Sequence, residues 1–385
     1  MQVSYTLNLN RVPKELKLLL TLLQDEGNVD EINLQDINWN TFLELVMHHR
    51  VFPILHRRLQ KLNLPIDGSI LQALQQDFKN NTFQMLHLSA EMQYMSRLLA
   101  ERGIRSLFLK GPILATELYR DLSLRTSCDL DVLVPLADLQ LTEELLIEQG
   151  YEKDDYIETV LGDWKWRHHH VTYFHPVKGI KFEVHWRLNP GPAIEPRFQD
   201  LWQRRRTRRF GHEDVAFLGQ EDLFFFLVAH GARHGWSRLR WLLDIHQFVK
   251  QDVDWKKVSR TLQAHGYLQV GGQALILASS LLKTSLSTNM VTLLKGKHPE
   301  RLAQEAVFYL ESMINLHTEP LPHDVSVYHK KHLVSLMSPM QKTMFLISFL
   351  YPYPEDAKTL PLPKSLHFLY FPLRPAIWAW KKIVR

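Results

Sequence analysis

The sequence predicts an α+β fold in which a small mixed sheet lies between two helical regions. In the first and last parts of the chain, apolar residues recur every three or four positions, which is the period of an amphipathic helix. In the middle, short apolar runs alternate with helical segments and are bounded by glycine and proline. A chain of 385 residues is long enough for two or three domains. We expect a helical region at 1–100, an α/β core at 101–215 and a helical domain at 216–385.

The N-terminal region, residues 14–100, reads as helices and ends in one long amphipathic helix. From residue 71 the apolar side chains keep a helical spacing; they are Leu74, Phe78, Met85, Leu88, Met92, Met95 and Leu99. Gly103 suits the left-handed position that commonly follows the end of a helix. We therefore expect the long helix to end near Gly103.

The middle region predicts the order β-α-β-α-β-β between residues 104 and 187. The expected strands are 104–109, 129–134 and the two arms of a hairpin, 168–176 and 179–186, and the expected helices are 112–119 and 136–150. Pro112 suits the first position of a helix, and Pro135 ends the second strand. Together these elements predict a small mixed sheet that packs against helices.

The region after residue 220 is helical again. Amphipathic segments at 221–234, 237–251 and 254–266 are followed by a long apolar segment. The last segment, 365–385, is aromatic and basic. We expect it to pack against the helical domain, and lying on a membrane surface is the alternative.

Composition argues against several classes of protein. The formal net charge is +5, and the densest basic cluster, "RRRTRR" at 204–209, reads as a solvated loop or helix face. No basic-aromatic pattern supports a nucleic-acid partner. The longest uncharged run, 266–282, is too short and too polar for a membrane span. With a single cysteine and no signal-peptide pattern in the N-terminal residues, we expect a cytoplasmic protein without disulfides.

The stretch "SCDLDVLV" places two aspartates in an apolar strand. Because side chains alternate across a strand, Asp129 and Asp131 point to one side, and Leu130 and Val132 to the other. Two neighbouring carboxylates repel each other unless a cation lies between them or they share a proton. Carboxylate oxygens on one strand suit Mg²⁺ (or Mn²⁺). The alternative is a partly exposed edge strand whose aspartates contact solvent or nearby arginines.

A third carboxylate occurs in the strand "KFEVHW". Glu183, His185 and Arg187 share one strand face. If this strand neighbours "DLDVLV", Glu183 joins Asp129 and Asp131. Three carboxylates from adjacent strands match two-metal phosphoryl or nucleotidyl transfer, in which the cations stabilise the attacking and the leaving oxygen.

The stretch "LFLKGPIL" reads as a strand, a Lys-Gly step and the start of a helix. Gly111 allows a phosphate to approach the backbone, and the helix start offers free N–H groups. Lys110 adds a positive charge, and Arg125 precedes Asp129 by four residues and can reach the same anion. These three residues are the expected phosphate-binding groups.

Taken together, "GIRSLFLKGPILATELYRDLSLRTSCDLDVLV" resembles the core of the uncharacterised bacterial nucleotidyltransferases of the DNA polymerase β-like superfamily. The shared features are a leucine-lysine-glycine step, an arginine before the acidic strand, and a D-x-D-x-L-V strand. The resemblance extends to "IKFEVHWRL" and into "HGARHGWSRLRWLLDIHQF", so it spans roughly residues 40–250. It implies a polymerase β-like nucleotidyltransferase core, flanked by N-terminal and C-terminal helical domains.

The resemblance also implies roles for individual residues. Asp129 and Asp131 would hold Mg²⁺, and Glu183 would complete the metal site and help to deprotonate an acceptor hydroxyl. Lys110 and Gly111 would cradle the phosphates of the donor. The chain departs from the superfamily pattern at Pro112, which has no N–H for a phosphate, and in its longer gap between the glycine and the acidic strand.

Three functions fit the resemblance. The first is transfer of a nucleotidyl or related phosphoryl-linked group from a nucleotide to a hydroxyl or phosphate. The second uses a nucleotide-sugar donor to glycosylate a (phospho)peptide, and the third is a catalytically silent adaptor that binds nucleotide or peptide. Family members often lie in gene clusters for lasso peptides or polysaccharides, so the resemblance implies a peptide, sugar or small alcohol as acceptor.

Other polar residues have structural and functional interpretations. His230 and His234 lie at i and i+4, a spacing that binds zinc, but packing beneath the core or lining an acceptor site fits better without a third ligand. Arg240 and Asp244 have the spacing of a helical ion pair that could also line the cleft. His185 is a further candidate for the cleft, and one histidine of 168–170 could face it. Cys128 is expected in the core, on the strand face opposite the aspartates.

Overall fold

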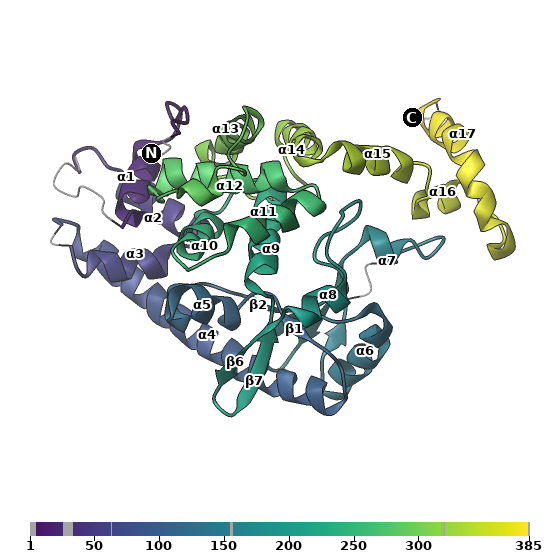
Figure 1. Ribbon diagram of the computed structural model, residues 1–385, viewed down its shortest axis with the longest axis horizontal. Helices are drawn as coiled ribbons and strands as arrows, with labels where there is room; N and C mark the ends of the chain where they lie inside the picture. The colour runs from purple at the N-terminus through teal and green to yellow at the C-terminus, as the bar shows by residue number, and fades with distance from the viewer. Residues whose placement is uncertain are drawn as a thin grey trace.

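The computed structural model describes residues 5–25, 34–62, 64–154, 157–316, 318 and 320–383. In this part of the chain, seventeen α-helices accompany one seven-stranded mixed, open sheet, which confirms the α+β fold class (Figure 1). Figure 1 shows the sheet and its helices below a second, helical layer, and an arm of C-terminal helices to one side. The domain boundaries stay a prediction.

Four helices form the N-terminal region, as predicted: α1 (Lys14–Leu23), α2 (Trp39–His48), α3 (Phe52–Leu59) and α4 (Gly68–Glu101). Residues 26–33 and 63 of this region lie outside the described residues. Helix α4 is the predicted long helix. The Asp67 side chain caps its start by accepting a hydrogen bond from the Ser69 N–H, and Gly103 follows its end with φ +70°.

The sheet has the strand order β3-β4-β5-β2-β1-β7-β6. Its strands are β1 (Leu107–Phe108), β2 (Asp129–Leu133), β3 (Glu152–Lys153), β4 (His170–His175), β5 (Ile180–His185), β6 (Arg206–Phe210) and β7 (Glu213–Phe217). The predicted hairpin is β4–β5, and β5 lies beside β2 in parallel. Helices α5 (Pro112–Tyr119), α6 (Leu139–Glu148), α7 (Trp164–Arg167) and α8 (Phe198–Gln203) connect the strands.

The basic run at 204–209 is mostly a strand, so its prediction as a loop or helix face was wrong. It enters β6, which pairs with β7 in an antiparallel hairpin. Arg206 and Arg208 lie on one face of β6, and both form ion pairs with the buried carboxylate of Glu117 on α5, at 2.6 and 2.8 Å. The carboxylate of Glu117, which lies far from this run in the sequence, compensates the positive charge of Arg206 and Arg208.

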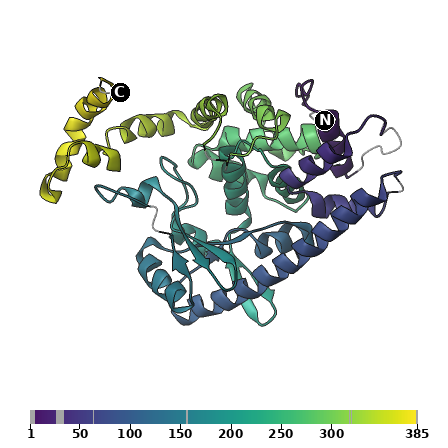
Figure 2. The same cartoon turned by 180° about the vertical axis from the view of Figure 1, so that it is seen from behind.

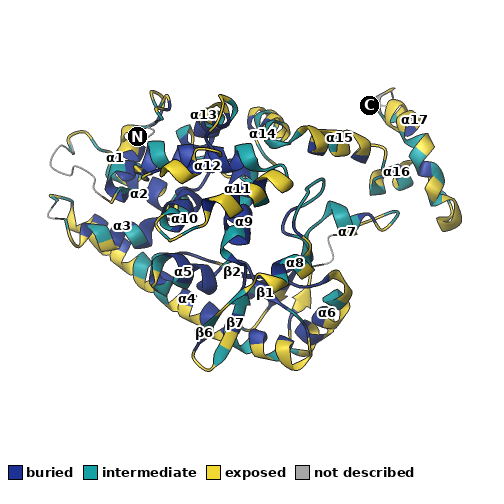
Figure 3. Ribbon diagram, viewed as in Figure 1, coloured by how far each residue is buried: buried dark blue, intermediate teal, exposed yellow. Residues whose placement is uncertain are grey.

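One face of the sheet is apolar and packs against α4. Met85, Leu88 and Met92 of α4 share a buried core with residues of β2 and β5, including Leu130 and Val132. The outer face of α4 is exposed along much of its length (Figure 3). The alternation of side chains in β2 therefore turns the aspartates away from α4, to the opposite face of the sheet.

The C-terminal region begins with the predicted helices, α9 (Gln220–Arg233), α10 (Leu239–Val249), α11 (Trp255–Ala264) and α12 (Leu268–Leu282), followed by α13 (His298–Glu311) and α14 (His323–Leu336). These helices share a second core with α1–α3, which includes Leu16, Phe42 and Leu55 from the N-terminal side. Helices from the N-terminal region and from the first part of the C-terminal region thus form one helical layer above the sheet (Figure 1).

Three helices, α15 (Pro339–Ser348), α16 (Pro354–Thr359) and α17 (Tyr370–Ile383), form an arm that extends away from α12 and α13 (Figure 2). The prediction that the last segment packs against the helical domain was wrong. Its ion pairs run from Arg374 and Lys381 to Asp356 of α16, because that buried carboxylate lies within the arm itself. In the described part of the chain, no helix is long and apolar enough to cross a membrane.

Candidate active site

A polar pocket of about 460 Å³ lies between the sheet and the helical layer. Its walls come from β2 and β5, from α9 and α10, and from Arg50, which follows α2. Charged and imidazole side chains dominate the lining. The predicted residues Lys110, Arg125, Asp129, Glu183, His185, His230, His234 and Arg240 all line this pocket.

Asp131 and Glu183 lie side by side, because β2 and β5 run parallel with these two residues in register. The Asp131 side chain is fully buried, and Lys110 donates to its Oδ1 atom over 2.8 Å. Glu183 is mostly buried and pairs with Lys181 over 2.6 Å. The alternative interpretation of an edge strand is wrong, because β2 lies between β5 and β1, and a lysine rather than an arginine or solvent compensates Asp131.

His185 joins the two carboxylates. Its Nε2 atom lies 3.1 Å from Asp131 Oδ1 and 3.5 Å from Glu183 Oε2. The three side chains offer ligand atoms within 4.8 Å of one another, which is the spacing of a metal site. Two atoms of this cluster, Asp131 Oδ2 and His185 Nδ1, are buried without a hydrogen-bond partner among the described residues.

Asp129 is more exposed and lies apart from this trio. Its Oδ1 accepts a hydrogen bond from Ser127 Oγ over 3.3 Å, and the residue lines the pocket. The compact group of potential ligands is Asp131, Glu183 and His185, without Asp129. A metal-binding role for Asp129 stays a prediction.

The electrostatics of the cluster favour charged forms of its members. Burial alone would raise the pKa of Glu183, but the hydrogen bond from His185 and the charge of Lys110 lower it well below its ordinary value. Burial would lower the pKa of His185, whereas its bonds to Asp131 and Glu183 raise it. Burial also opposes the charge of Lys110, and the carboxylates led by Asp131 raise its pKa.

Arg125, predicted as a phosphate-binding residue, is paired with the acid that was expected to pair with Arg240, and its role in phosphate binding stays a prediction. Its guanidinium donates to both carboxylate oxygens of Asp244, at 3.0 Å from Nε to Oδ1 and 3.0 Å from Nη2 to Oδ2. The predicted ion pair between Arg240 and Asp244 is therefore wrong, because Arg125 takes the carboxylate. Arg240 donates instead to the carbonyl and the hydroxyl of Thr126, at 2.8 and 3.0 Å.

The comparisons with known proteins agree with this geometry. A family model described as an uncharacterised nucleotidyltransferase matches residues 35–283, about two thirds of the chain. The chain belongs to this family. No curated protein matches it. The match runs from before α2 to the end of α12, so it includes both sides of the pocket and extends past the 40–250 expected from the motifs.

His230 and His234 line the pocket on the side of the helical layer. Both imidazoles contact the indole of Trp241, at ring-centroid distances of 5.5 and 5.2 Å. Neither belongs to a group of three potential metal ligands in the part of the chain that the structure describes. Burial and the charge of Lys110 lower the pKa of His230 well below its ordinary value. A role in acceptor binding stays a prediction for both.

Several pocket residues escape the sequence patterns. His169 and His170 both line the pocket and, with His185, form a second compact group of potential ligands. Arg233 donates to His169 Nε2 over 3.1 Å. Arg50 reaches the pocket from the N-terminal helices. The histidine run at 168–170 was the only signal, because the others depend on contacts between distant parts of the chain.

Gly111 was predicted to bind phosphate, and Cys128 was predicted to lie in the core. Gly111 has φ +75°, and a Cβ atom there would lie 3.4 Å from the carbonyl oxygen of Asp129. The glycine therefore permits the turn into α5, and its role in phosphate binding stays a prediction. Cys128 is exposed and lines the pocket, so its placement in the core was wrong. Strand β2 begins only at Asp129, and the alternation does not extend to Cys128.

Proposed function

We propose that the chain transfers a nucleotidyl or related phosphoryl-linked group from a nucleotide donor to a hydroxyl or phosphate acceptor. The observation that carries the proposal is the cluster of Asp131, Glu183 and His185, in a chain of a nucleotidyltransferase family. Glu183 and His185 line the polar pocket, and Asp131 is buried beside them. Two adjacent buried carboxylates with unpartnered polar atoms are costly for a scaffold. A cation bound between the carboxylates, with a phosphate beside it, would compensate their charge.

The residues present fit a divalent cation. Asp131 Oδ2 is a buried carboxylate oxygen beside Glu183 and His185, and it has no hydrogen-bond partner in the part of the chain that the structure describes. Two carboxylates suit Mg²⁺ and Mn²⁺, whereas an imidazole ligand is uncommon for Mg²⁺. We therefore expect Mn²⁺ to bind more tightly than Mg²⁺. A bound cation would supply stabilisation of the charge that develops on the transferred phosphoryl group.

Basic side chains of the pocket would bind the donor phosphates. Lys110 is nearest, and it pairs with Asp131 in the structure. With a cation held by Asp131 and Glu183, the Lys110 ammonium would be free to turn from Asp131 to a phosphate oxygen of the donor. Arg50 and Arg240 line the same pocket and add positive charge. Although burial raises the pKa of Glu183, the hydrogen bond from His185 and the charge of Lys110 lower it. Glu183 would therefore accept the proton of the acceptor hydroxyl only after Lys110 has turned to the phosphate.

Calorimetric titration tests the proposal directly. Nucleoside triphosphates and nucleotide-sugars are titrated into the wild type and Asp131→Asn, with and without Mg²⁺ or Mn²⁺. We expect donor binding that needs both a cation and Asp131. The exposed carboxylate of Asp214 offers a matched control, because Asp214→Asn removes one negative charge far from the pocket and should leave binding unchanged.

The outcomes also separate the related functions. Binding of nucleotide-sugars alone would assign a sugar transferase, and binding of peptide without any nucleotide or cation would assign an adaptor. No donor binding by the folded wild type would overturn the proposal, as would binding that Asp131→Asn leaves intact. With a donor identified, lasso-type peptides, sugars and small alcohols are the acceptors to test.

A further inference from the structure

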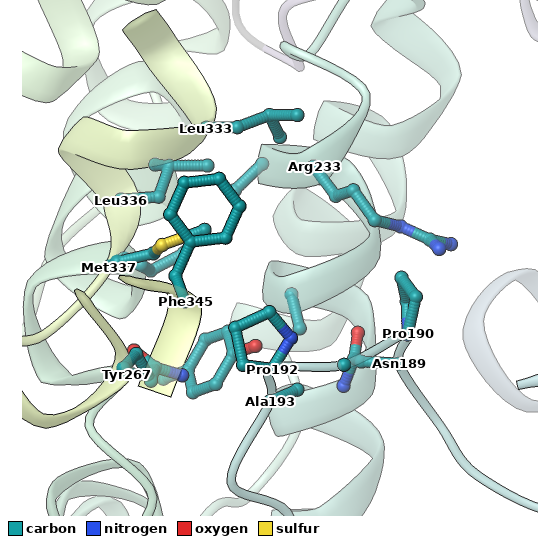
Figure 4. A pocket seen from close by; sticks show the side chains of 15 residues that line it. Asn189, Pro190, Pro192, Ala193, Arg233, Tyr267, Leu333, Leu336, Met337 and Phe345 are labelled. Carbon is teal, nitrogen blue, oxygen red and sulfur yellow. The ribbon is translucent and has the colours of Figure 1, made fainter. Parts of the chain in front are cut away.

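A second cavity, of about 220 Å³, adjoins the catalytic pocket (Figure 4). Four parts of the chain enclose it: the loop 189–193 after β5, helix α9, the start of α12, and the segment 333–345 of α14 and α15. Figure 4 shows Leu333, Leu336, Met337 and Phe345 together on one side of the cavity. The lining is mostly apolar, in contrast to the charged pocket beside it.

Arg233 lies at the boundary, because it lines both the cavity and the catalytic pocket. Its guanidinium points away from Phe345 (Figure 4) and bonds to two imidazoles, His169 over 3.1 Å and His230 over 3.5 Å. Its buried Nε has no hydrogen-bond partner among the residues that the structure describes. In the described part of the chain this guanidinium forms no ion pair with a carboxylate, and a desolvated cation without an anion is costly.

We propose that this cavity binds the acceptor, an amphipathic molecule whose apolar group fills the cavity and whose anionic group binds Arg233. The inference rests on the proposed function, since the acceptor oxygen must reach the catalytic pocket beyond Arg233. The anionic group is a carboxylate or a phosphate, because both match the fork of a guanidinium.

Size and position favour the acceptor over the donor as the occupant. Pockets that enclose drug-sized ligands have volumes of about 300–1,000 Å³, so this cavity holds a group of side-chain size rather than a nucleotide. The family match ends at residue 283, whereas Leu333, Leu336 and Phe345 lie beyond it. The catalytic pocket therefore lies within the family region, and one wall of the cavity is added by this chain's own C-terminal segment.

Calorimetric titration with small probes, without nucleotide or cation, tests the inference. N-acetylphenylalanine and phenyl phosphate carry an apolar ring beside a carboxylate or a phosphate, and N-acetylphenylalanine amide is the neutral control. We expect both anions to bind, and the amide at least tenfold more weakly. The relative affinity of the two anions then distinguishes a peptide carboxylate from a phosphorylated acceptor.

Matched variants locate the bound probe. Leu336→Asp places a negative charge in the cavity, whereas Val334→Asp places it on the exposed side of the same helix. We expect at least tenfold weaker binding in the first and no change in the second. Ala193→Trp fills the cavity from the opposite wall and tests the same point if Leu336→Asp does not fold. Arg233→Gln should abolish the preference for the anion over the amide.

The inference is overturned if the wild type binds neither anion, if the amide binds as tightly, or if the cavity variants match Val334→Asp. Because these titrations contain no donor, their result is separate from that of the donor titration. Probe binding with no donor binding would leave the cavity as a binding site and remove the transfer reaction. Donor binding without probe binding would support the transfer reaction and overturn the assignment of the cavity as the acceptor site.

Discussion

Two clusters of buried charge lie at the same pocket and differ in how completely they are satisfied. In the first, Arg125 and Asp244 are almost wholly buried, and both carboxylate oxygens accept hydrogen bonds from the guanidinium. The Tyr119 hydroxyl donates a further bond to Oδ1 over 2.8 Å. One positive and one negative charge balance. This cluster joins α5 and the segment before β2 to α10, and it is complete without a ligand.

The second cluster, Asp131, Glu183 and His185, is not complete. It holds two adjacent carboxylates, and two of its buried atoms, Asp131 Oδ2 and His185 Nδ1, have no hydrogen-bond partner within the described ranges of the chain. Its compensating lysines, Lys110 and Lys181, are partly exposed at the pocket, so both can move. A buried charge thus marks a candidate functional site when its partners are incomplete or exchangeable, and a structural site when they are complete.

The largest expected effect is on catalysis, at Glu183. Glu183→Gln removes a charge beside Asp131 and the proposed proton acceptor while it keeps the size of the side chain. We expect the rate of transfer to fall about 10³-fold, equivalent to about 4 kcal/mol of transition-state stabilisation. Steady-state kinetics with the donor found by titration measures this loss.

Lys181→Gln is the matched control for that variant, since Lys181 pairs with Glu183 but its side chain is 45% exposed. We expect a change of less than tenfold. A Glu183→Gln enzyme within tenfold of the wild type would place the reaction elsewhere in the pocket, and the contrast between the two clusters would lose its catalytic meaning.

The next effect is on stability, at Asp244. Asp244→Asn leaves the buried Arg125 guanidinium without a counter-charge, and we expect a loss of about 3 kcal/mol in the free energy of unfolding. Urea denaturation measures it. The exposed pair of Arg209 and Asp214 is the control, and Asp214→Asn should cost less than about 1 kcal/mol. A stable Asp244→Asn protein that no longer binds donor would contradict the structural role of this pair and support the predicted phosphate-binding role of Arg125.

The sequence predicted two of the three members of the second cluster, Asp131 and Glu183, but placed Asp129 where the structure has His185. It did not predict the first cluster. Strand alternation alone turns Asp131 away from the apolar face, and two apolar strands with acids at equivalent positions indicate a pair. The parallel register of β2 and β5 then sets Asp131 opposite Glu183. The direction of each side chain could be predicted from the sequence, because strand alternation depends only on neighbouring residues.

Contacts between residues that lie far apart in the sequence could not be predicted from these patterns. Arg125 and Asp244 are separated by 119 positions, and the nearer Arg240 satisfied the helical spacing rule although it bonds to Thr126. The basic run at 204–209 suggested solvent because its acid, Glu117, lies far back in the chain. In each case the carboxylate that pairs with the arginine is remote in the sequence, and only the fold brings the two side chains together.

A smaller effect concerns pH, since histidines surround the second cluster and none belongs to the first. Burial and the charge of His185 lower the pKa of His170 to about 4. Between its ordinary value of about 6.5 and this value, the unfolded chain binds the proton and the folded chain does not, so stability falls as the pH falls. At pH 5 the loss is about 2 kcal/mol for this group.

His170→Asn should reduce the difference in unfolding free energy between pH 7 and pH 5 by about that amount. His212→Asn, at an exposed turn between β6 and β7, is the control and should leave the difference unchanged. His185 acts in the opposite direction, because its pKa is raised; its contribution is present below its ordinary pKa and is lost as the pH rises through the folded value. An unchanged difference in His170→Asn would mean that the His170 imidazole is as accessible to protons in the folded chain as in the unfolded one.

The smallest effect tests whether the first cluster is as complete as its geometry indicates. Tyr119→Phe removes one hydrogen bond, 2.8 Å long, to Asp244 Oδ1, but Arg125 still donates to both oxygens of that carboxylate. We expect a loss of about 1 kcal/mol in the free energy of unfolding, because a single bond is lost and the charges stay paired. Denaturation of Tyr119→Phe, Asp244→Asn and the double variant forms a cycle, in which the coupling should account for most of the Tyr119 effect. If Tyr119→Phe cost as much as Asp244→Asn, the pair of Arg125 and Asp244 would depend on the hydroxyl, and this cluster too would count as incomplete.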